Sequence, residues 1–325
     1  MKKEYVLGIG AANIDINGRS NQPIILHDSN PGFMSISAGG VTRNVLENLA
    51  RIGYPCKIIT AIGDDNNGKF IKKYSTEAGI DFSYALTVKN KNSSSYLCIL
   101  NESGDMYISL SDMHIINNIT VDYLKKVEEV ILNAKIITID PCLSEEVLDF
   151  ICKKHSKDKE IFCDPVSSAY AKRIKKYLPY IHTIKPNELE LAVLTDYPTH
   201  TKQEKIKACK ILIEKGVKRV FVSLGKEGCL YYDNLGNCLT KSFNEVEMIN
   251  ASGAGDSFMA GVIYSYVNDF DIEKTLDFAL AAGIVAISTT HTINPEMGLN
   301  KIEEIILKER GKKWVLKNTW VLQMK

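Results

Sequence analysis

The sequence predicts an α/β protein with one doubly wound, mainly parallel sheet flanked by helices, and a small β-sheet lid. Short apolar strand patterns alternate with helical patterns along most of the 325 residues. Such alternation is typical of a parallel sheet that is covered on both faces. Two polar, strand-like segments interrupt the alternation and have no place in that sheet. Since we find no internal repeat and no long linker, we expect a single domain over residues 1–310.

The elements of the main sheet follow from apolar periodicity. Residues 5–11 form the first strand pattern, and apolar side chains at helical spacing over 41–52 predict the first long helix. A strand is expected over 57–61, and a helix that ends at glycine is expected over 66–79. Later strands are expected at 135–139, 160–163, 181–184 and 219–223, with helices over 144–153 and 203–215.

The two interrupting segments are expected to form the lid. Residues 13–37 form short, polar, strand-like segments, and residues 92–114 contain a hairpin around a turn with glycine. A lid over a ligand crevice would exclude water during a reaction, whereas the alternative is a hairpin without a functional role. The segment 311–325 contains both tryptophans and no acidic residue. It could pack on the body, pair with a neighbour or be an artificial extension of the chain.

The composition excludes several classes of function. A net charge of +1 gives no electrostatic basis for binding nucleic acid or a membrane surface. The first apolar run is too short for a signal peptide or a membrane span. The eight cysteines have no CxxC spacing and no cluster with histidines. We therefore expect buried free thiols in a reducing cytoplasm, and neither disulfides nor a zinc site.

The most informative motif is the turn Gly253-Ala254-Gly255-Asp256, which precedes an apolar helical pattern. Glycines let backbone N–H groups approach a ligand. A helix start adds unpaired N–H groups and the positive end of the helix dipole, which together suit a phosphate. A carboxylate would repel that phosphate unless Asp256 accepts the proton of a hydroxyl that attacks phosphorus. The alternative is an ordinary first-turn aspartate that the dipole favours.

A second group of residues surrounds the start of the first long helix. The diglycine Gly39-Gly40 would let a substrate approach the backbone, and Asn44 adds an amide. Asn13 and Asp15 follow the first strand, whose carboxyl end faces the binding crevice in open α/β sheets. The carboxylate of Asp15 can accept hydrogen bonds from two adjacent sugar hydroxyls. A simple turn at the diglycine and an Asx turn at Asp15 are the alternatives.

Two further motifs follow later strands. Asn187 and Glu190 would share one face of a first helical turn, and this pair suits a hydrated Mg²⁺. A capping box is the alternative. Ser223, Gly225 and Gly228 lie where a strand enters a glycine-rich turn, which borders a nucleotide or makes only a tight connection. No Walker motif is present, and the dinucleotide fingerprint that begins in the first strand lacks its third glycine.

Four of these motifs occur in a fixed order along the chain: Asn13 with Asp15, Gly39-Gly40 with Asn44, Asn187 with Glu190, and Gly253-Ala254-Gly255-Asp256. This order resembles that of the ribokinase-like (PfkB-type) sugar kinases over about residues 5–310. The resemblance implies ATP with Mg²⁺ and phosphorylation of a primary hydroxyl. It implies Asp256 as the base, with Gly253, Ala254 and Gly255 as the anion hole. It further implies that Asn187 and Glu190 hold the metal through water. The implied sugar-binding residues are Asn13, Asp15, Gly39, Gly40 and Asn44, and the implied nucleotide-binding residues are Asn187, Ser223, Gly225 and Gly228.

Smaller features resemble the pseudouridine kinases within this family. They are the segments 28–32, 41–44, 92–96, 111–113, 164–167 and 182–187. They imply the 5′-hydroxyl of pseudouridine as the acceptor, with ribose, inosine, adenosine or a ketose as the alternative substrates. A regulator without catalysis and a nicotinamide dehydrogenase are the rival classes. The candidates for reading the base are Ser29, Asn30, Ser95 and Asp112.

Two further implications concern a cation and a partner. Many members of the family carry an Asp-Thr pair that helps to bind a monovalent cation, whereas this chain has Asn250-Ala251 at that place. The resemblance therefore does not extend to a potassium requirement. Lid strands in such proteins often pair between subunits, so the resemblance allows a homodimer through the lid.

Overall fold

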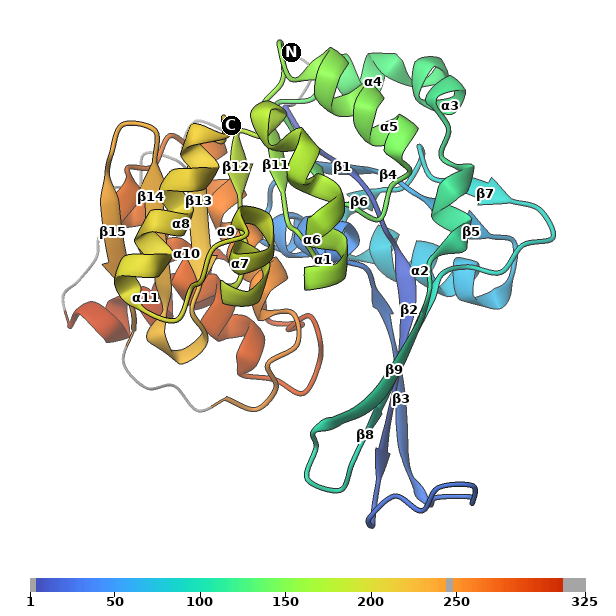
Figure 1. Cartoon of the computed structure of the whole chain (residues 1–325). Coiled ribbons are helices and arrows are strands. Elements are labelled where there is room, and N and C mark those ends of the chain that lie inside the picture. Colours follow the sequence, from blue (N-terminus) through green and yellow to red (C-terminus); the bar gives the residue numbers. More distant parts are fainter. Residues whose placement is uncertain (1–3, 244–247, 312–325) are drawn as a thin grey trace.

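The computed structural model describes residues 4–243 and 248–311 of the chain. Within them, a nine-stranded sheet has the order β15-β14-β13-β12-β11-β10-β1-β4-β6. In this spatial order, each strand from β13 to β6 is parallel to the next one. β14 and β15 are paired antiparallel at the other end of the sheet. Helices lie on both sides of this sheet (Figure 1). The predicted doubly wound, mainly parallel fold is therefore confirmed.

The strands of the main sheet are short, and the longest helix around it has 16 residues. The strands are β1 (Val6–Ile9), β4 (Cys56–Ile59), β6 (Ile80–Asp81), β10 (Ile136–Ile139), β11 (Ile161–Cys163), β12 (Thr183–Ile184), β13 (Arg219–Ser223), β14 (Cys229–Asp233) and β15 (Cys238–Lys241). The α-helices are α1 (Val41–Arg51), α2 (Asn66–Glu77), α3 (Val121–Lys126), α4 (Glu128–Leu132), α5 (Glu145–Asp149), α6 (Ser168–Ile174), α7 (Glu188–Thr195), α8 (Lys202–Glu214), α9 (Ala254–Val267), α10 (Ile272–Ile287) and α11 (Leu299–Arg310).

Two hydrophobic cores lie on the two faces of the main sheet. Because alternate residues of a strand point to opposite faces, Val6 of β1 belongs to one core and Leu7 to the other. The core with Val6 includes Leu46 of α1 and Val262 of α9. The core with Leu7 includes Leu191 of α7. The helices α1 and α9, whose N-terminal turns carry predicted site residues, therefore pack on the same face.

Two predicted elements differ in detail from the observed ones. The strand expected over 57–61 ends at Ile59, and the next residues form β5 (Ala61–Gly63), which pairs with β7 (Leu86–Val88) in a separate sheet. The helix expected over 144–153 is α-helical only to Asp149 and continues as a π-helical turn over Phe150–His155. Periodicity did not detect these changes because the apolar pattern continues through both of them.

The four strands outside the main alternation form a second sheet in the order β3-β2-β8-β9, here named the lid sheet. It projects from the body of the molecule (Figure 1). Its hairpins are antiparallel, whereas β2 and β8 pair in parallel. Its use as a lid stays a prediction. The strands are β2 (Asn13–Ser20), β3 (Gly32–Gly39), β8 (Ser95–Leu100) and β9 (Met106–Asp112).

The strand register gives the lid sheet one polar and one apolar face. Residues that are paired across neighbouring strands share a face, and the next residue along each strand points to the other face. Asp15 of β2 is paired with Ser37 of β3 and Tyr96 of β8, and Tyr96 is paired with Ser111 of β9. We name this side the polar lid face. The opposite, apolar lid face carries Ile16, Met34, Ile36, Leu97, Ile99, Ile108 and Leu110.

Two predictions concern the chain as a whole. No helix within residues 4–243 and 248–311 is both long and apolar enough to cross a membrane. The tail expected over 311–325 lies, apart from Gly311 at the end of α11, outside the described residues. The alternatives given for it stay predictions.

Candidate active site

The turn before α9 has the backbone geometry of an anion site. Gly253 caps the helix in the left-handed region with φ of 77°, and a side chain there would collide with the carbonyl oxygen of Thr292. The N–H of Ser257 closes the first turn by donating to the carbonyl of Gly253 over 2.9 Å. The N–H of Ala254 donates to the carbonyl of Ala251 over 3.5 Å, whereas the N–H groups of Gly255 and Asp256 have no acceptor further back in the helix. They are therefore oriented to receive a negatively charged group.

Asp256 lies in the first turn of α9 and accepts a hydrogen bond of 2.8 Å from Nδ2 of Asn44. Burial and the nearby carboxylate of Asp164 raise the pKa of Asp256 to about 7. The hydrogen bond from Asn44 and the charge of Lys185 oppose this rise, because both stabilise the ionised form. A carboxylate with a pKa near neutrality can accept a proton at physiological pH.

Lys185 places a buried positive charge beside the anion turn. Its Nζ atom lies 2.9 Å from Oδ2 of Asp164, and both residues are buried. Nζ also lies 2.9 Å from the position that a Cβ on Gly255 would occupy, so the amine contacts the turn where Gly255 has no side chain. Burial lowers the pKa of Lys185, but Asp164 and Glu190 outweigh that effect and raise it above its usual value. The amine is therefore charged.

Sequence reasoning assigned no role to Asp164 or Lys185. Asp164 directly follows β11, and Lys185 directly follows β12. The rule that singled out Asp15, a polar residue at the carboxyl end of a strand, applies equally to both. The sequence therefore showed a polar residue after each strand, but it did not indicate that the two side chains pair or that Lys185 reaches Gly255.

The predicted sugar-binding residues lie together at the base of the lid sheet. Nδ2 of Asn13 donates to Oδ1 of Asp15 over 2.6 Å. The carboxylate of Asp15 lies against Gly39, where any side chain would collide with it. Gly40 has φ of 99° and precedes α1, so its N–H and C=O directions depend on glycine. Burial raises the pKa of Asp15, and the bond from Asn13 partly offsets that rise.

Asn187 and Glu190 form the capping box that was the structural alternative for them. The N–H of Glu190 donates to Oδ1 of Asn187, and the N–H of Asn187 donates to Oε2 of Glu190, both over 2.9 Å. Glu190 is buried. Burial and Asp164 raise its pKa. The part of the chain that the structure describes holds no cluster of three or more His, Cys, Asp or Glu residues that could hold a metal ion.

The glycine-rich turn after β13 is adjacent to this capping box. Ser223 bridges to Asn187, and its N–H donates to the carbonyl of Pro186 over 3.0 Å. Gly228 has φ of 85°, and a side chain there would collide with the backbone of β15. Gly225 has φ of 57° with open space around it. The structure thus brings the predicted metal and nucleotide residues side by side. The presence of glycine at position 228 also has a purely structural explanation.

The four candidates for reading the base do not share the polar lid face. Ser95 is paired with Asp112 and with Ile14, so these side chains lie on the face opposite to Asp15. Asn30 lies in the connection between β2 and β3. Its Oδ1 accepts from the N–H of Ile25 over 2.7 Å, and its Nδ2 donates to the carbonyl oxygen of Ile25 over 2.9 Å. Ser29 is exposed in the same connection.

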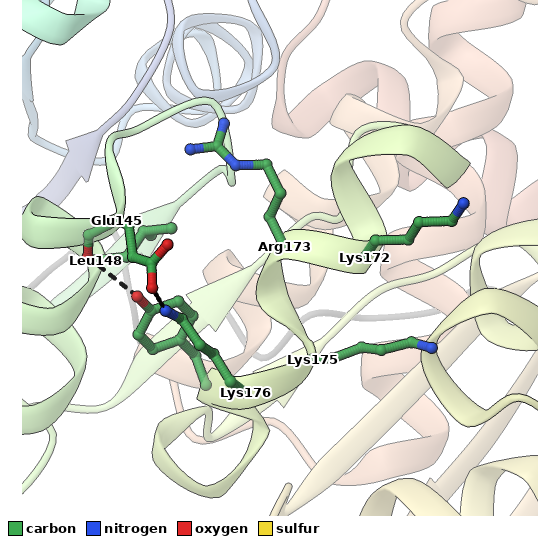
Figure 2. A pocket seen from close by; sticks show the side chains of 7 residues that line it. Glu145, Leu148, Lys172, Arg173, Lys175 and Lys176 are labelled. Carbon is green, nitrogen blue, oxygen red and sulfur yellow. Dashed lines mark hydrogen bonds and ion pairs between the residues drawn. The ribbon is translucent and has the colours of Figure 1, made fainter.

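A basic pocket of about 280 Å³ lies apart from these residues, against α5 and α6 (Figure 2). Lys176 is ion-paired with Glu145, and the side chains of Lys172 and Lys175 point away from that pair (Figure 2). Lys175 is paired with Asp196 over 2.6 Å. None of the predicted site residues lines this pocket. Its charges are largely satisfied within the protein, so it is not the candidate active site.

Comparisons with known sequences agree with the order of motifs. Residues 3–297 match the sequence model of the pfkB family of carbohydrate kinases. The pseudouridine kinase of Escherichia coli strain K12 is 33% identical over 305 residues, which cover 94% of this chain and 97% of that protein. A guanosine-inosine kinase of Exiguobacterium acetylicum is 26% identical over 89% of this chain and 96% of that protein.

Solved structures share the fold. A Clostridium perfringens crystal structure described as a sugar kinase superposes with a TM-score of 0.84 at 33% identity, covering 95% of this chain and 97% of the other. The Arabidopsis thaliana ribokinase, solved with ribose and ATP, has a TM-score of 0.80 at 22% identity, covering 94% and 99%. An Escherichia coli structure described as ribokinase II with ATP and Mg²⁺ has a TM-score of 0.79 at 21% identity, covering 94% and 99%.

Proposed function

Since the chain belongs to the pfkB family of carbohydrate kinases, we propose that it transfers the γ-phosphoryl group of ATP to the 5′-hydroxyl of pseudouridine. The observation that carries the proposal is the position of Asp256, which combines a pKa of about 7, a hydrogen bond from Asn44 and the start of α9. The relative that is 33% identical over nearly the whole chain supports the choice of substrate.

In the proposed reaction, the ribose lies against Asn13, Asp15 and the diglycine. Asp256 accepts the proton of the 5′-hydroxyl as its oxygen forms a bond to the γ-phosphorus. The bond from the γ-phosphorus to the bridging oxygen of ADP breaks, and ADP leaves with that electron pair. First-turn N–H groups of α9 and the amine of Lys185 stabilise the charge on the transferred group. The chemistry therefore relies on positioning and electrostatics.

Asn187 and Glu190 fit a hydrated Mg²⁺ better than a directly bound one. The capping box already engages an oxygen of each side chain, and only Glu190 carries a negative charge. Mg²⁺ commonly keeps several waters and uses one or two carboxylates of the protein. When bound, it would neutralise part of the phosphate charge. We place the ATP against Ser223, Gly225 and Gly228, which are adjacent to this pair.

Two further parts of the proposal concern the need for a monovalent cation and the location of the protein in the cell. Nδ2 of Asn250 donates to the carbonyl of Thr290 over 3.1 Å, and Oδ1 accepts from the N–H of Ser252 over 3.0 Å. An amide in that role brings no negative charge to a cation, so we propose that turnover has no potassium requirement. We propose a cytoplasmic location, where ATP and reduced thiols are available.

A homodimer through the apolar lid face is also proposed. The outer strands of the lid sheet, β3 and β9, expose Met34, Ile36, Ile108 and Leu110 by 58 to 72%. An apolar face that is open to water in this way favours burial against a partner. A second copy of the chain is the proposed occupant because its own apolar lid face has the same chemistry. The polar lid face would then stay free for the nucleoside.

A parallel substrate assay tests the proposed function. ADP formation is measured with pseudouridine, uridine, inosine and ribose at equal concentrations, and products are identified by mass. We expect the highest kcat/KM for pseudouridine and a 5′-monophosphate as product. Inosine is included because the guanosine-inosine kinase supports it as the alternative substrate. If ribose or inosine is preferred, the proposed substrate is wrong but the kinase activity is confirmed. If none of the four compounds supports ADP formation, the proposed function is wrong.

A further inference from the structure

Arg43 is a fully buried cation that the proposed mechanism does not use. It is 2% exposed and makes hydrogen bonds to three elements. Its Nη1 donates to the carbonyl of Ala38 over 2.9 Å and to Oδ1 of Asn44 over 2.6 Å, and its Nε donates to Oγ of Ser75 over 3.2 Å. Its Nη2 is paired with Glu47. Such complete coordination of a buried guanidinium fixes its position.

The bond to Asn44 also determines how the amide of Asn44 is oriented. Arginine has N–H donors only, so the atom of Asn44 that faces Arg43 must be its oxygen. The NH₂ group then points in the other direction, where Nδ2 donates to Asp256 over 2.8 Å. A rotated amide would place donor against donor at Arg43 and oxygen against carboxylate at Asp256. Both arrangements are repulsive.

We propose that Arg43 is a positioning residue that holds the Asn44 amide as a donor to Asp256 and so keeps that carboxylate ready to accept a proton. Arg43 also fixes the carbonyl of Ala38, the residue before the diglycine. One side chain therefore sets the proposed base and the backbone of the proposed sugar site together. The proposal rests on the phosphoryl-transfer role of Asp256 and does not depend on which nucleoside is the substrate.

The charged groups around Asp256 come from four elements. Asp15 lies on β2, Arg43 on α1, Asp164 after β11 and Lys185 after β12. A change at Arg43 leaves the other three in place. Without the guanidinium, the amide of Asn44 is free to rotate and to present its oxygen to Asp256, which would favour the protonated carboxyl. The fraction of enzyme with an ionised base at neutral pH would then fall.

The test compares Arg43→Met with Arg51→Met. Arg51 lies on the same helix and pairs with the same Glu47 at 2.7 Å, but no contact joins it to Asn44. For Arg43→Met we expect kcat to fall by about 10–100-fold, the acid limb of its pH profile to move to higher pH, and KM for the nucleoside to rise. Arg51→Met should change none of the three. Equal pH midpoints and equal kcat in the two variants would overturn the proposal.

A double-mutant cycle with Asn44→Ala separates positioning from a purely structural role. Once the Asn44 amide is absent, Arg43→Met should lower kcat by less than about threefold, because only the charge of Arg43 then acts on Asp256. Additive losses would overturn the proposal. If Arg43→Met does not fold, as judged by thermal melting, the same cycle is run with Arg43→Lys. Lysine keeps the charge but lacks the planar fork, so we expect the same non-additivity. If the wild type itself has no kinase activity, the proposed function is contradicted instead of the role of Arg43.

Discussion

Nδ2 of Asn44 donates a 2.8 Å hydrogen bond to Oδ2 of Asp256 across 212 residues of sequence. The bond joins the first turn of α1 to the first turn of α9, two helices that pack in the same core. Asn44 belongs to the proposed sugar site and Asp256 to the proposed phosphate site. The contact therefore joins the two proposed sites, and in the proposed reaction it brings the acceptor hydroxyl close to Asp256.

The pH dependence of turnover should reflect the titration of Asp256. Its pKa in the folded protein is raised to about 7, so the ionised form is lost as pH falls through that value. Since only the ionised form accepts a proton, we expect kcat to fall about tenfold per pH unit below the midpoint. ADP formation at saturating substrates between about pH 5 and pH 9 measures this limb. A rate that stays constant down to pH 5 would show that another group is the base.

Lys185→Met should lower turnover more than it weakens nucleoside binding. The change removes the amine beside Gly255 and leaves Asp164 buried without its ion-pair partner. We expect kcat to fall about 10²–10³-fold and the free energy of unfolding to drop by about 3–5 kcal/mol. Lys175→Met, which removes a lysine paired with the exposed Asp196, is the control. A kcat close to that of the control would remove Lys185 from the reaction.

Base selectivity should depend on the polar lid face. Ser111 shares that face with Asp15, whereas Ser95 lies on the opposite one. We expect Ser111→Ala to change the ratio of kcat/KM for pseudouridine over uridine by about tenfold, because a lost hydrogen-bond partner affects one isomer more than the other. Ser95→Ala is the matched variant and should leave the ratio unchanged. The reverse result would assign base reading to Ser95, as the sequence alone proposed.

Motifs formed by residues close together in the sequence were easier to predict than contacts between residues far apart in it. The alternation of apolar patterns predicted the fold class. Polar residues after strands singled out Asp15 and Asn187 as candidates, and the glycine turn before a helix singled out Asp256. The orientation of Ser95 and Asp112 depends on strand register, which a hairpin pattern alone does not determine. Contacts between distant side chains were equally difficult to predict. Lys185 pairs with Asp164 from another strand end, and the Asn44 amide that contacts Arg43 reaches Asp256 on another helix.

The state of assembly should depend on the apolar lid face. Leu110 is 70% exposed at the edge strand β9. Leu110→Lys introduces a charge whose burial in a partner interface is unfavourable, so we expect the variant to be monomeric where the wild type is a dimer. Light scattering after size exclusion measures the mass at several concentrations. Leu235→Lys, at an 82% exposed leucine outside the lid sheet, is the control and should remain dimeric. A monomeric wild type at all concentrations contradicts the proposed dimer.

The proposed role of Asp256 is tested most directly by the rate at which Asp256→Asn phosphorylates the 5′-hydroxyl of pseudouridine, compared with Asp122→Asn. Asp122 is also a first-turn aspartate, in α3, but it lies at the surface. We expect Asp256→Asn to lower kcat by about 10²–10⁴-fold. It should melt no lower than the wild type above pH 7, because the charge that it removes is partly buried. Asp122→Asn should keep its full rate. A folded Asp256→Asn variant that phosphorylates the nucleoside as fast as Asp122→Asn would contradict the proposed role of Asp256.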